Sequence, residues 1–162
     1  MVERTQTVPS NADILAVLAE VFDPEIPTLS VLDLGIVREV EASASKIKVK
    51  ITPTYSGCPA MQMIENDIKQ ALGTKYTLPI QVDVVLAPAW TTEWLTEKGR
   101  AGLKASAIAP PDKLVTLGKQ TPACPYCNSR ETEKTSEFGS TACKSFYRCK
   151  ACLQPFDYFK EL

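Results

Sequence analysis

The sequence predicts an α+β fold, in which a small α-β-β-α-β domain with a mixed sheet packed by helices precedes a short cysteine-rich ribbon. Three observations predict it. Apolar residues recur at helical spacing after residue 10 and again after residue 59. Apolar and polar residues alternate over residues 46–52 and 80–86. Two Cys-x-x-Cys pairs stand near the C-terminus. The 162 residues suffice for one core of about 100 residues and a small second part.

The first expected element is a helix over residues 10–22. Ser10, followed three residues later by Asp13, forms the start typical of a capping box. Asp23-Pro24 ends the helix, because proline cannot continue the hydrogen-bond ladder. The expected apolar face consists of Ile14, Leu15, Leu18, Val21 and Phe22.

A long loop over residues 23–35 follows this helix. It holds two prolines, three acidic residues and a glycine between two regular elements, which is where binding residues often lie. Asp23, Glu25 and Asp33 are therefore candidate metal ligands. The alternative is that these carboxylates are solvated or cap the loop.

Three strands are expected next to one another in the first domain. Residues 36–41 and 46–52 form a hairpin whose second strand alternates strictly between apolar residues and lysines or threonine. Residues 80–86 form the third strand, and a helix connects it to the hairpin. This order gives the mixed sheet of the predicted fold.

The connecting helix begins next to a cysteine. Pro59 suits the first helical position, and Gly73 marks the end of the apolar face. This places Cys58 at or next to the N-cap, where unpaired amides and the helix dipole lower the pKa of a thiol. Such a thiolate is a nucleophile or a soft-metal ligand. The alternative is that Cys58 is a small packed hydrophobic residue. The apolar face consists of Ala60, Met61, Ile64, Ile68, Ala71 and Leu72.

The first domain is expected to end after a weak helix that contains Gly99 and Gly102. The predicted limits are residues 1–107 for this domain, 108–121 for a proline-rich linker and 122–162 for the ribbon. Trp90 and Trp94 precede the weak helix. They are either core residues or an aromatic anchor for a partner.

The two cysteine pairs predict a zinc ribbon. Cys124 and Cys127 lie in one turn and Cys149 and Cys152 in another, so that four thiolates can complete a closed tetrahedron around Zn²⁺. A site with four cysteine ligands keeps no open position, which makes it structural. A dithiol redox pair, an iron–sulfur cluster and two disulfides are the alternatives. Cys143 belongs to neither pair. It could replace a ligand of the ribbon, pair transiently with Cys58 or simply pack in the core, and packing is favoured.

Composition excludes several classes of protein. The chain has no histidine, which rules out imidazole chemistry. Residues 119–162 carry seven basic and five acidic residues, too small an excess for a surface that binds a nucleic-acid backbone. The first ten residues lack the features of a signal peptide, and no apolar run approaches the ~20 residues of a membrane span. A cytoplasmic protein is expected, and six cysteines arranged in this way fit a reducing compartment.

Two sets of motifs resemble known families. Asp23-Pro-Glu-Ile-Pro, Asp33-Leu-Gly and Thr52-Pro-Thr-Tyr-Ser-Gly-Cys58-Pro are similar to the iron–sulfur cluster assembly domain family. The segments Ala87-Pro-Ala-Trp-Thr-Thr-Glu-Trp, Phe138-Gly-Ser-Thr-Ala-Cys-Lys and Gln154-Pro-Phe-Asp-Tyr-Phe-Lys resemble the family of D subunits of bacterial phenylacetyl-CoA epoxidases. The resemblance spans nearly the whole chain.

This resemblance implies a non-catalytic accessory protein in aerobic phenylacetate degradation. The family's di-iron site belongs to another subunit, and the D subunit helps to assemble or repair metal centres. Cys58 matches the family's reactive cysteine, and Asp23, Glu25 and Thr54 would line the same site. The resemblance implies a transient iron or iron–sulfur cluster as load and the oxygenase or reductase subunits as partners. It leaves homodimerisation open.

Three rival functions are open to this sequence. A structural adaptor of the epoxidase would need the ribbon but not Cys58. A zinc-ribbon protein that binds nucleic acid would need a basic aromatic face. A thiol–disulfide oxidoreductase would use one Cys-x-x-Cys pair beside a βαβ element, whereas here the pairs are doubled and remote from the expected sheet.

Overall fold

The computed structural model describes residues 7–160 and forms two compact units, Met1–Trp90 and Thr91–Leu162. Residues 1–6, on which part of the signal-peptide prediction rests, lie outside the described residues, as do residues 161–162 of the predicted ribbon. In the described part of the chain, no helix is long and apolar enough to cross a membrane.

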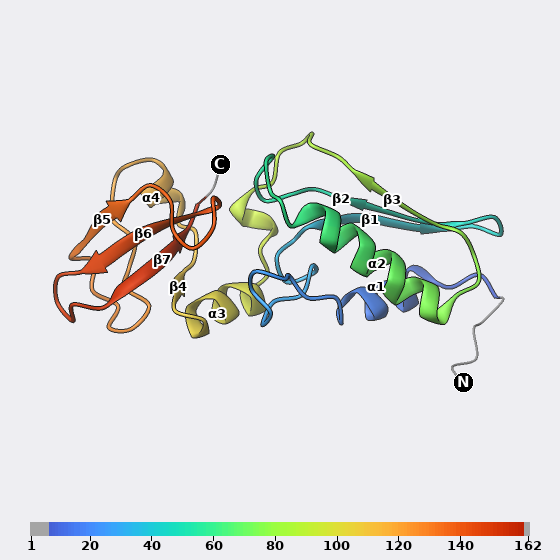
Figure 1. Ribbon diagram of the computed structural model, residues 1–162, viewed down its shortest axis with the longest axis horizontal. Helices are drawn as coiled ribbons and strands as arrows, with labels where there is room; N and C mark the ends of the chain where they lie inside the picture. The colour runs from blue at the N-terminus through green and yellow to red at the C-terminus, as the bar shows by residue number, and fades with distance from the viewer. Residues whose placement is uncertain (1–6, 161–162) are drawn as a thin grey trace. The chain divides into compact units, whose positions relative to one another are not determined.

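The first unit is the predicted α-β-β-α-β domain (Figure 1). Strand β1 pairs antiparallel with β2, and β2 pairs in parallel with β3, which gives a mixed sheet in the order β1-β2-β3. Helix α2 contacts β3, and α1 contacts both α2 and β1. The elements are α1 (Asn11–Leu18), β1 (Val37–Ala42), β2 (Ile47–Ile51), α2 (Met61–Lys75) and β3 (Ile80–Val84).

The core of the first unit follows the predicted periodicities. Ile47, Val49 and Ile51 of β2 are fully buried, while the lysines between them are partly exposed on the other face of the strand. On α2 the fully buried positions are Ile64, Ile68 and Leu72, four residues apart. Each buried aliphatic side chain of this kind contributes about 1.5–3 kcal/mol to folding.

Helix α1 is shorter than predicted. Its capping box is confirmed, since the Asp13 amide donates to Ser10 Oγ and the Asp13 carboxylate accepts from the Ser10 amide. The helix ends at Leu18, however, and not at Phe22. Val21 accepts a hydrogen bond from the Val31 amide, and Phe22 forms a bridge with Ser30, so these residues pair with the following loop. The prediction of one apolar face up to Phe22 was therefore wrong, and Phe22 is 41% exposed.

Helix α2 continues beyond its predicted end. Gly73 lies inside the helix, which runs to Lys75, and the amide of Tyr76 still donates to Leu72. A glycine inside a helix costs about 1 kcal/mol relative to alanine. The Ile80 side chain lies 3.6 Å from the position that a Cβ of Gly73 would take, which is ordinary van der Waals contact, so packing against Ile80 does not require a glycine here.

The second unit is a four-stranded sheet in the order β4-β7-β6-β5, preceded by two short helical segments. Strand β4 pairs in parallel with β7, and the other pairs are antiparallel. The elements are η1 (Thr92–Trp94), α3 (Glu97–Ala105), β4 (Ile108–Ala109), α4 (Lys113–Thr116), β5 (Thr132–Ser136), β6 (Lys144–Cys149) and β7 (Pro155–Phe159).

The compact units and the predicted domains have different limits. Helix α3 contacts β4, so it belongs to the compact second unit, although the sequence places it in the domain of residues 1–107. The predicted linker, residues 108–121, contains β4 and α4. Compactness does not test which part of a chain folds alone, so the domain limits stay a prediction.

Trp90 is a core residue of the first unit. Its indole is 3% exposed, and the indole N–H donates to the Leu34 carbonyl at 2.8 Å. This hydrogen bond ties the end of the first unit to the loop of residues 23–35. Trp94 is half-buried.

The buried face of α2 predicts a strong dependence of stability on Ile64. Ile64→Ala should lower the free energy of unfolding by about 2–5 kcal/mol, because it leaves a cavity at a fully buried position. Met63→Ala is the matched control. Met63 is next in sequence but 54% exposed, so its loss should cost within about 0.5 kcal/mol. Urea unfolding followed by Trp fluorescence measures both, and equal costs would contradict the assigned face.

Candidate functional site

The four cysteines of the two pairs converge in the second unit. Their sulfur atoms all lie within 4.8 Å of one another, with 3.6 Å between Cys124 and Cys152 and 3.6 Å between Cys127 and Cys149. A tetrahedron with Zn–S distances of about 2.3 Å has sulfurs about 3.8 Å apart. A disulfide requires about 2.05 Å. The geometry therefore fits one metal ion and not two disulfides.

Two turns bring these thiols together. In the first turn, the Cys124 amide donates to Ser129 and the Asn128 amide donates back to Cys124. Cys149 is the last residue of β6, and its amide donates to Gln154 across the β6–β7 turn. Asn128 and Leu153 have positive φ angles of 62° and 64°, a conformation that asparagine adopts readily and that costs energy for leucine. Each turn thus reverses the chain through one left-handed residue next to a cysteine of the cluster.

Backbone donors favour the thiolate form of Cys149, whereas the pKa values of Cys127 and Cys152 are raised because burial and neighbouring thiols outweigh their backbone donors. The Cys152 amide lies 3.5 Å from the Cys149 sulfur, and this hydrogen bond is the largest cause lowering the pKa of Cys149 to about 7. A metal-binding thiol must lose its proton, so a lowered pKa assists binding. The cysteine pairs also border the core of the unit, where Tyr147 and Phe156 stack with ring centroids 5.8 Å apart. A metal ion with four cysteine ligands at this position would cross-link the two turns next to the core of the second unit.

Cys58 lies in a separate loop of the first unit, between β2 and α2. Its amide donates to the Tyr55 carbonyl, closing a tight turn, and its side chain is half-buried. The helix begins later than predicted, and its N-cap is Ala60. The Ala60 carbonyl accepts the first i to i−4 hydrogen bond of the helix, from the Ile64 amide. Cys58 is therefore two residues before the N-cap, and the expected position at or next to it was wrong.

The neighbours of Cys58 in sequence are hydroxyl residues and a glycine. Thr52 and Thr54 are buried, and Thr52 Oγ1 has no hydrogen-bond partner within the described residues. A Cβ on Gly57 would lie 3.1 Å from the Tyr55 ring, so glycine lets this ring fold over the turn. The thiol in this turn is half-buried.

Two of the three loop acids act inside their own loop. Asp23 is buried, and its Oδ1 accepts from the amides of Glu25 and Ile26 at 2.8 and 2.9 Å. Asp33 accepts from the Ser30 hydroxyl at 2.8 Å. These contacts correspond to the capping alternative. In the described range 7–160, only the four cysteines form a group of three or more possible metal ligands. The placement of Asp23, Glu25 and Thr54 around Cys58 stays a prediction.

Cys143 is buried, with its sulfur 3.0 Å from Thr141 Oγ1. The segment around it folds onto Asp157, whose carboxylate accepts from the amide and hydroxyl of Ser140. Any Cβ on Gly139 would lie only 2.1 Å from this carboxylate, so the close approach requires glycine. These contacts support packing as the role of Cys143.

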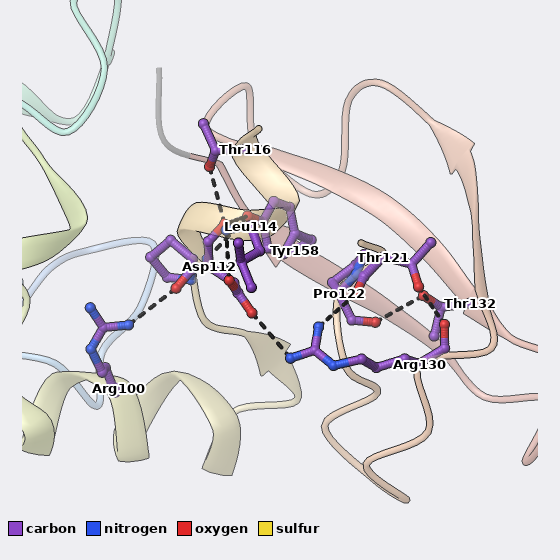
Figure 2. A network of polar contacts seen from close by, with 10 residues as sticks. Arg100, Asp112, Leu114, Thr116, Thr121, Pro122, Arg130, Thr132 and Tyr158 are labelled. Carbon is purple, nitrogen blue, oxygen red and sulfur yellow. Dashed lines mark hydrogen bonds and ion pairs between the residues drawn. The ribbon is translucent and has the colours of Figure 1, made fainter. Parts of the chain in front are cut away.

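Sequence reasoning missed a polar network in the second unit (Figure 2). Asp112 caps α4 by accepting from the Leu114 amide and pairs with Arg130 at 3.2 Å, while its own amide donates to the Tyr158 hydroxyl. Arg100 donates to the carbonyls of Pro111 and Thr92. The Pro-Pro-Asp sequence before α4 is a helix-start signal that could have located this network, although it is equally typical of a linker.

Comparison with known families assigns both units. Residues 11–85 match the family described as "Iron-sulfur cluster assembly protein", and residues 109–160 match the "PaaD zinc beta ribbon domain". The protein thus combines an iron–sulfur cluster assembly domain with a four-cysteine zinc β-ribbon. Over 154 residues it is 45% identical to the D subunit of the "Putative 1,2-phenylacetyl-CoA epoxidase" of Escherichia coli (strain K12), covering 94% of this chain and 93% of that protein. The chain belongs to this family of phenylacetyl-CoA epoxidase D subunits, which confirms the resemblance.

The assembly domain has further relatives. The chain is 32% identical over 91 residues to an "Fe-S protein maturation auxiliary factor" of Porphyromonas gingivalis, covering 55% of this chain and 86% of that protein. It is also similar to the crystal structure of a domain of unknown function, DUF59, from Bacillus anthracis. That match has a TM-score of 0.51 and 29% identity, covering 57% of this chain and 89% of the other.

The cysteine geometry predicts that one ligand substitution opens the metal site. After dialysis against EDTA, the wild-type protein should keep about one zinc per chain, whereas Cys127→Ser should lose it, because three thiolates hold the ion less tightly. Cys143→Ser is the matched control, since this cysteine lies in the same unit but outside the cluster. Atomic absorption measures the zinc content per chain. If Cys127→Ser keeps about one zinc per chain, the assigned ligands are contradicted.

Proposed function

We propose that this protein is a non-catalytic accessory subunit of a phenylacetyl-CoA epoxidase system and that it assists assembly or repair of iron or iron–sulfur centres through Cys58. Family membership supports the first part. The match of residues 11–85 to iron–sulfur cluster assembly proteins, and a relative named as a maturation factor, support the second.

One observation carries the assignment to Cys58. Its thiol is half-buried in a tight loop between β2 and α2, outside the four-cysteine cluster. The other cysteine outside that cluster, Cys143, is buried. Cys58 is thus the thiol of the assembly domain that an external metal centre can reach.

The two kinds of thiol site suit different tasks. Cys124, Cys127, Cys149 and Cys152 would hold Zn²⁺ with four thiolates, and zinc there supplies a structural cross-link with no open position. A single thiolate with oxygen ligands binds a soft metal less tightly than four thiolates do, so it can release its load. Cys58 therefore acts as a transient ligand of the cargo, with Asp23, Glu25 and Thr54 proposed to line the same site.

The partners follow from this role. The oxygenase or reductase subunits of the epoxidase system would receive the iron or the cluster. A second copy of the chain is a further partner, because two Cys58 thiolates from a homodimer can bridge one cluster. The reaction centre of the epoxidase is expected on another subunit, so this chain is assigned no catalytic residue.

A structural adaptor is the second candidate function. Its support is a set of exposed apolar side chains in the second unit, each more than half exposed: Leu117, Tyr126, Phe138 and Leu153. Exposed apolar side chains anchor an interface where they gather in one patch. This function needs the folded ribbon and no chemistry at Cys58.

Metal and sulfide content distinguishes the two functions. Protein purified without oxygen should carry one zinc together with iron and acid-labile sulfide, and Cys58→Ser should lose the iron and sulfide while keeping the zinc. The reason is that only Cys58 is proposed to hold the cargo. Iron, zinc and sulfide are measured per chain in both proteins, and Cys143→Ser serves as the control for loss of a cysteine.

The opposite result would point to the adaptor. If wild type and Cys58→Ser both carry one zinc and no iron or sulfide, cluster carriage through Cys58 is contradicted. Epoxidase activity in cells that express Cys58→Ser gives a second readout, since an adaptor tolerates this substitution and a maturation factor does not.

A further inference from the structure

The two turns that carry the cysteine pairs, residues 124–128 and 149–153, are the knuckles of the ribbon, and both end in the same backbone conformation. Asn128 ends the first knuckle with a φ angle of 62°, and Leu153 ends the second with a φ angle of 64°. Asparagine visits this left-handed region readily because its short polar side chain bonds locally, whereas the Cβ of a leucine there crowds the following carbonyl oxygen. The first knuckle thus has a residue suited to its turn, and the second does not.

The second unit gains little from Leu153 in return for this conformational cost. The residue is 61% exposed, so most of its apolar surface stays in contact with water. A leucine stabilises a fold mainly through the apolar surface that it buries. Residues held in sparsely populated backbone regions cluster at functional sites. An exposed leucine in the left-handed region therefore points to a contact outside the folded unit.

The other knuckle presents an exposed aromatic residue. Tyr126 lies between Cys124 and Cys127 and is 54% exposed. The sulfur atoms of the two knuckles lie within 4.8 Å of one another, so Tyr126 and Leu153 belong to the same end of the second unit. Tyrosine is enriched among the residues that carry most of the binding energy of protein interfaces. One interface of ordinary size, about 800 Å² on each partner, is large enough to cover both residues.

Lysines beside the knuckles decide between the possible occupants of this surface. The exposed Lys104 donates to Asn128 Oδ1 at 2.8 Å, and no carboxylate pairs with its ammonium within residues 7–160. The Lys150 ammonium, in the second knuckle, lies 3.3 Å from the Glu133 carboxylate. A symmetric contact between two copies of the chain would bring these lysines toward their own copies, which is unfavourable. A different protein that offers a carboxylate to Lys104 is the better match.

The cysteine cluster would hold the two halves of this surface in place. Tyr126 and Leu153 lie on turns that are far apart in sequence and that meet at the four sulfur atoms. A metal ion with four cysteine ligands fixes both turns before any partner binds. A surface that is already ordered loses less conformational freedom on binding, which leaves more of the contact energy for affinity.

We propose that the knuckle end of the ribbon docks on another subunit of the epoxidase system, with Leu153 and Tyr126 as apolar anchors and Lys104 at the rim. The matching surface of that subunit is apolar and edged by a carboxylate. This inference rests on the proposed function, which makes the chain an accessory subunit, and it names the surface through which the chain is held. It requires no chemistry at Cys58.

Binding of the full-length, zinc-loaded protein to the purified oxygenase and reductase subunits of the epoxidase tests this surface. Biolayer interferometry at constant ionic strength should show saturable binding to at least one of them. Leu153→Asn should weaken this binding about five- to fiftyfold, because the exposed part of the leucine is no longer buried by the partner. Tyr126→Ala should weaken it about tenfold or more. Lys104→Met should weaken it about two- to fivefold, and less at high salt.

Thermal unfolding separates a docking residue from a residue that holds the fold. Leu153→Asn gives the second knuckle the residue type of the first, so its unfolding midpoint should equal or exceed that of the wild type, with one zinc per chain retained. Leu114→Asn is the matched control, since Leu114 is another exposed leucine of the second unit, at 42%, but lies in helix α4. This variant should bind the subunits as the wild type does and should gain no stability.

The outcomes distinguish this surface from the proposed function. If the wild type binds a subunit and Leu153→Asn binds it equally well, the surface is contradicted while the accessory role stands. If the wild type binds none of the purified subunits, both are contradicted. The surface is also contradicted if zinc-loaded Leu153→Asn unfolds at a clearly lower temperature than the wild type. A wild-type dimer that Leu153→Asn dissociates would contradict it as well, because a second copy would then be the occupant.

Discussion

The second unit depends on the convergence of four thiols from two turns that are far apart in sequence. The hydrophobic cluster beside these thiols is small, and two of its six buried members are Cys124 and Cys149. Strand β5 adds only Thr132 to the buried residues. Small domains of this size usually need a metal or disulfides in addition to their buried side chains. A metal ion that joins the turn before β5 to the β6–β7 turn closes a long loop, and its binding free energy becomes folding free energy.

The first unit has no such requirement, because its core is made of fully buried aliphatic side chains from both helices and the sheet. The loops around this core are held by their own polar contacts. Asp23 and Asp33 cap turns within residues 23–35, and the Trp90 indole bonds to Leu34. The fold of the first unit therefore rests on its aliphatic core and on these loop contacts.

Local signals are predictable from the sequence, and contacts between distant segments are not. The Ser10–Asp13 capping box and the alternation of β2 rest on short-range rules that the structure confirms. The convergence of the two cysteine pairs is the exception, a distant contact that is predictable because a tetrahedral metal site needs four ligands. The predicted helix start near Cys58 is misplaced. Proline is favoured at the first position of a helix, but Pro59 fits that preference equally well in a turn that precedes the helix. Gly73 indicates a helix end by the same kind of local rule, yet α2 continues to Lys75. Strand β4 escapes prediction because two residues form a strand only through pairing with Asp157 and Tyr158, nearly fifty positions later.

The proposed function places two thiol sites of unequal affinity in one chain, and this has a consequence for the order of loading. Four thiolates bind a soft metal ion more tightly than one thiolate with oxygen ligands, so an empty ribbon would capture any iron that reached Cys58. A ribbon already closed around zinc has no open coordination position and cannot compete. Zinc in the ribbon would then do more than hold the fold. It would also keep the second unit inert toward the cargo, so that the load at Cys58 is lost only to a partner.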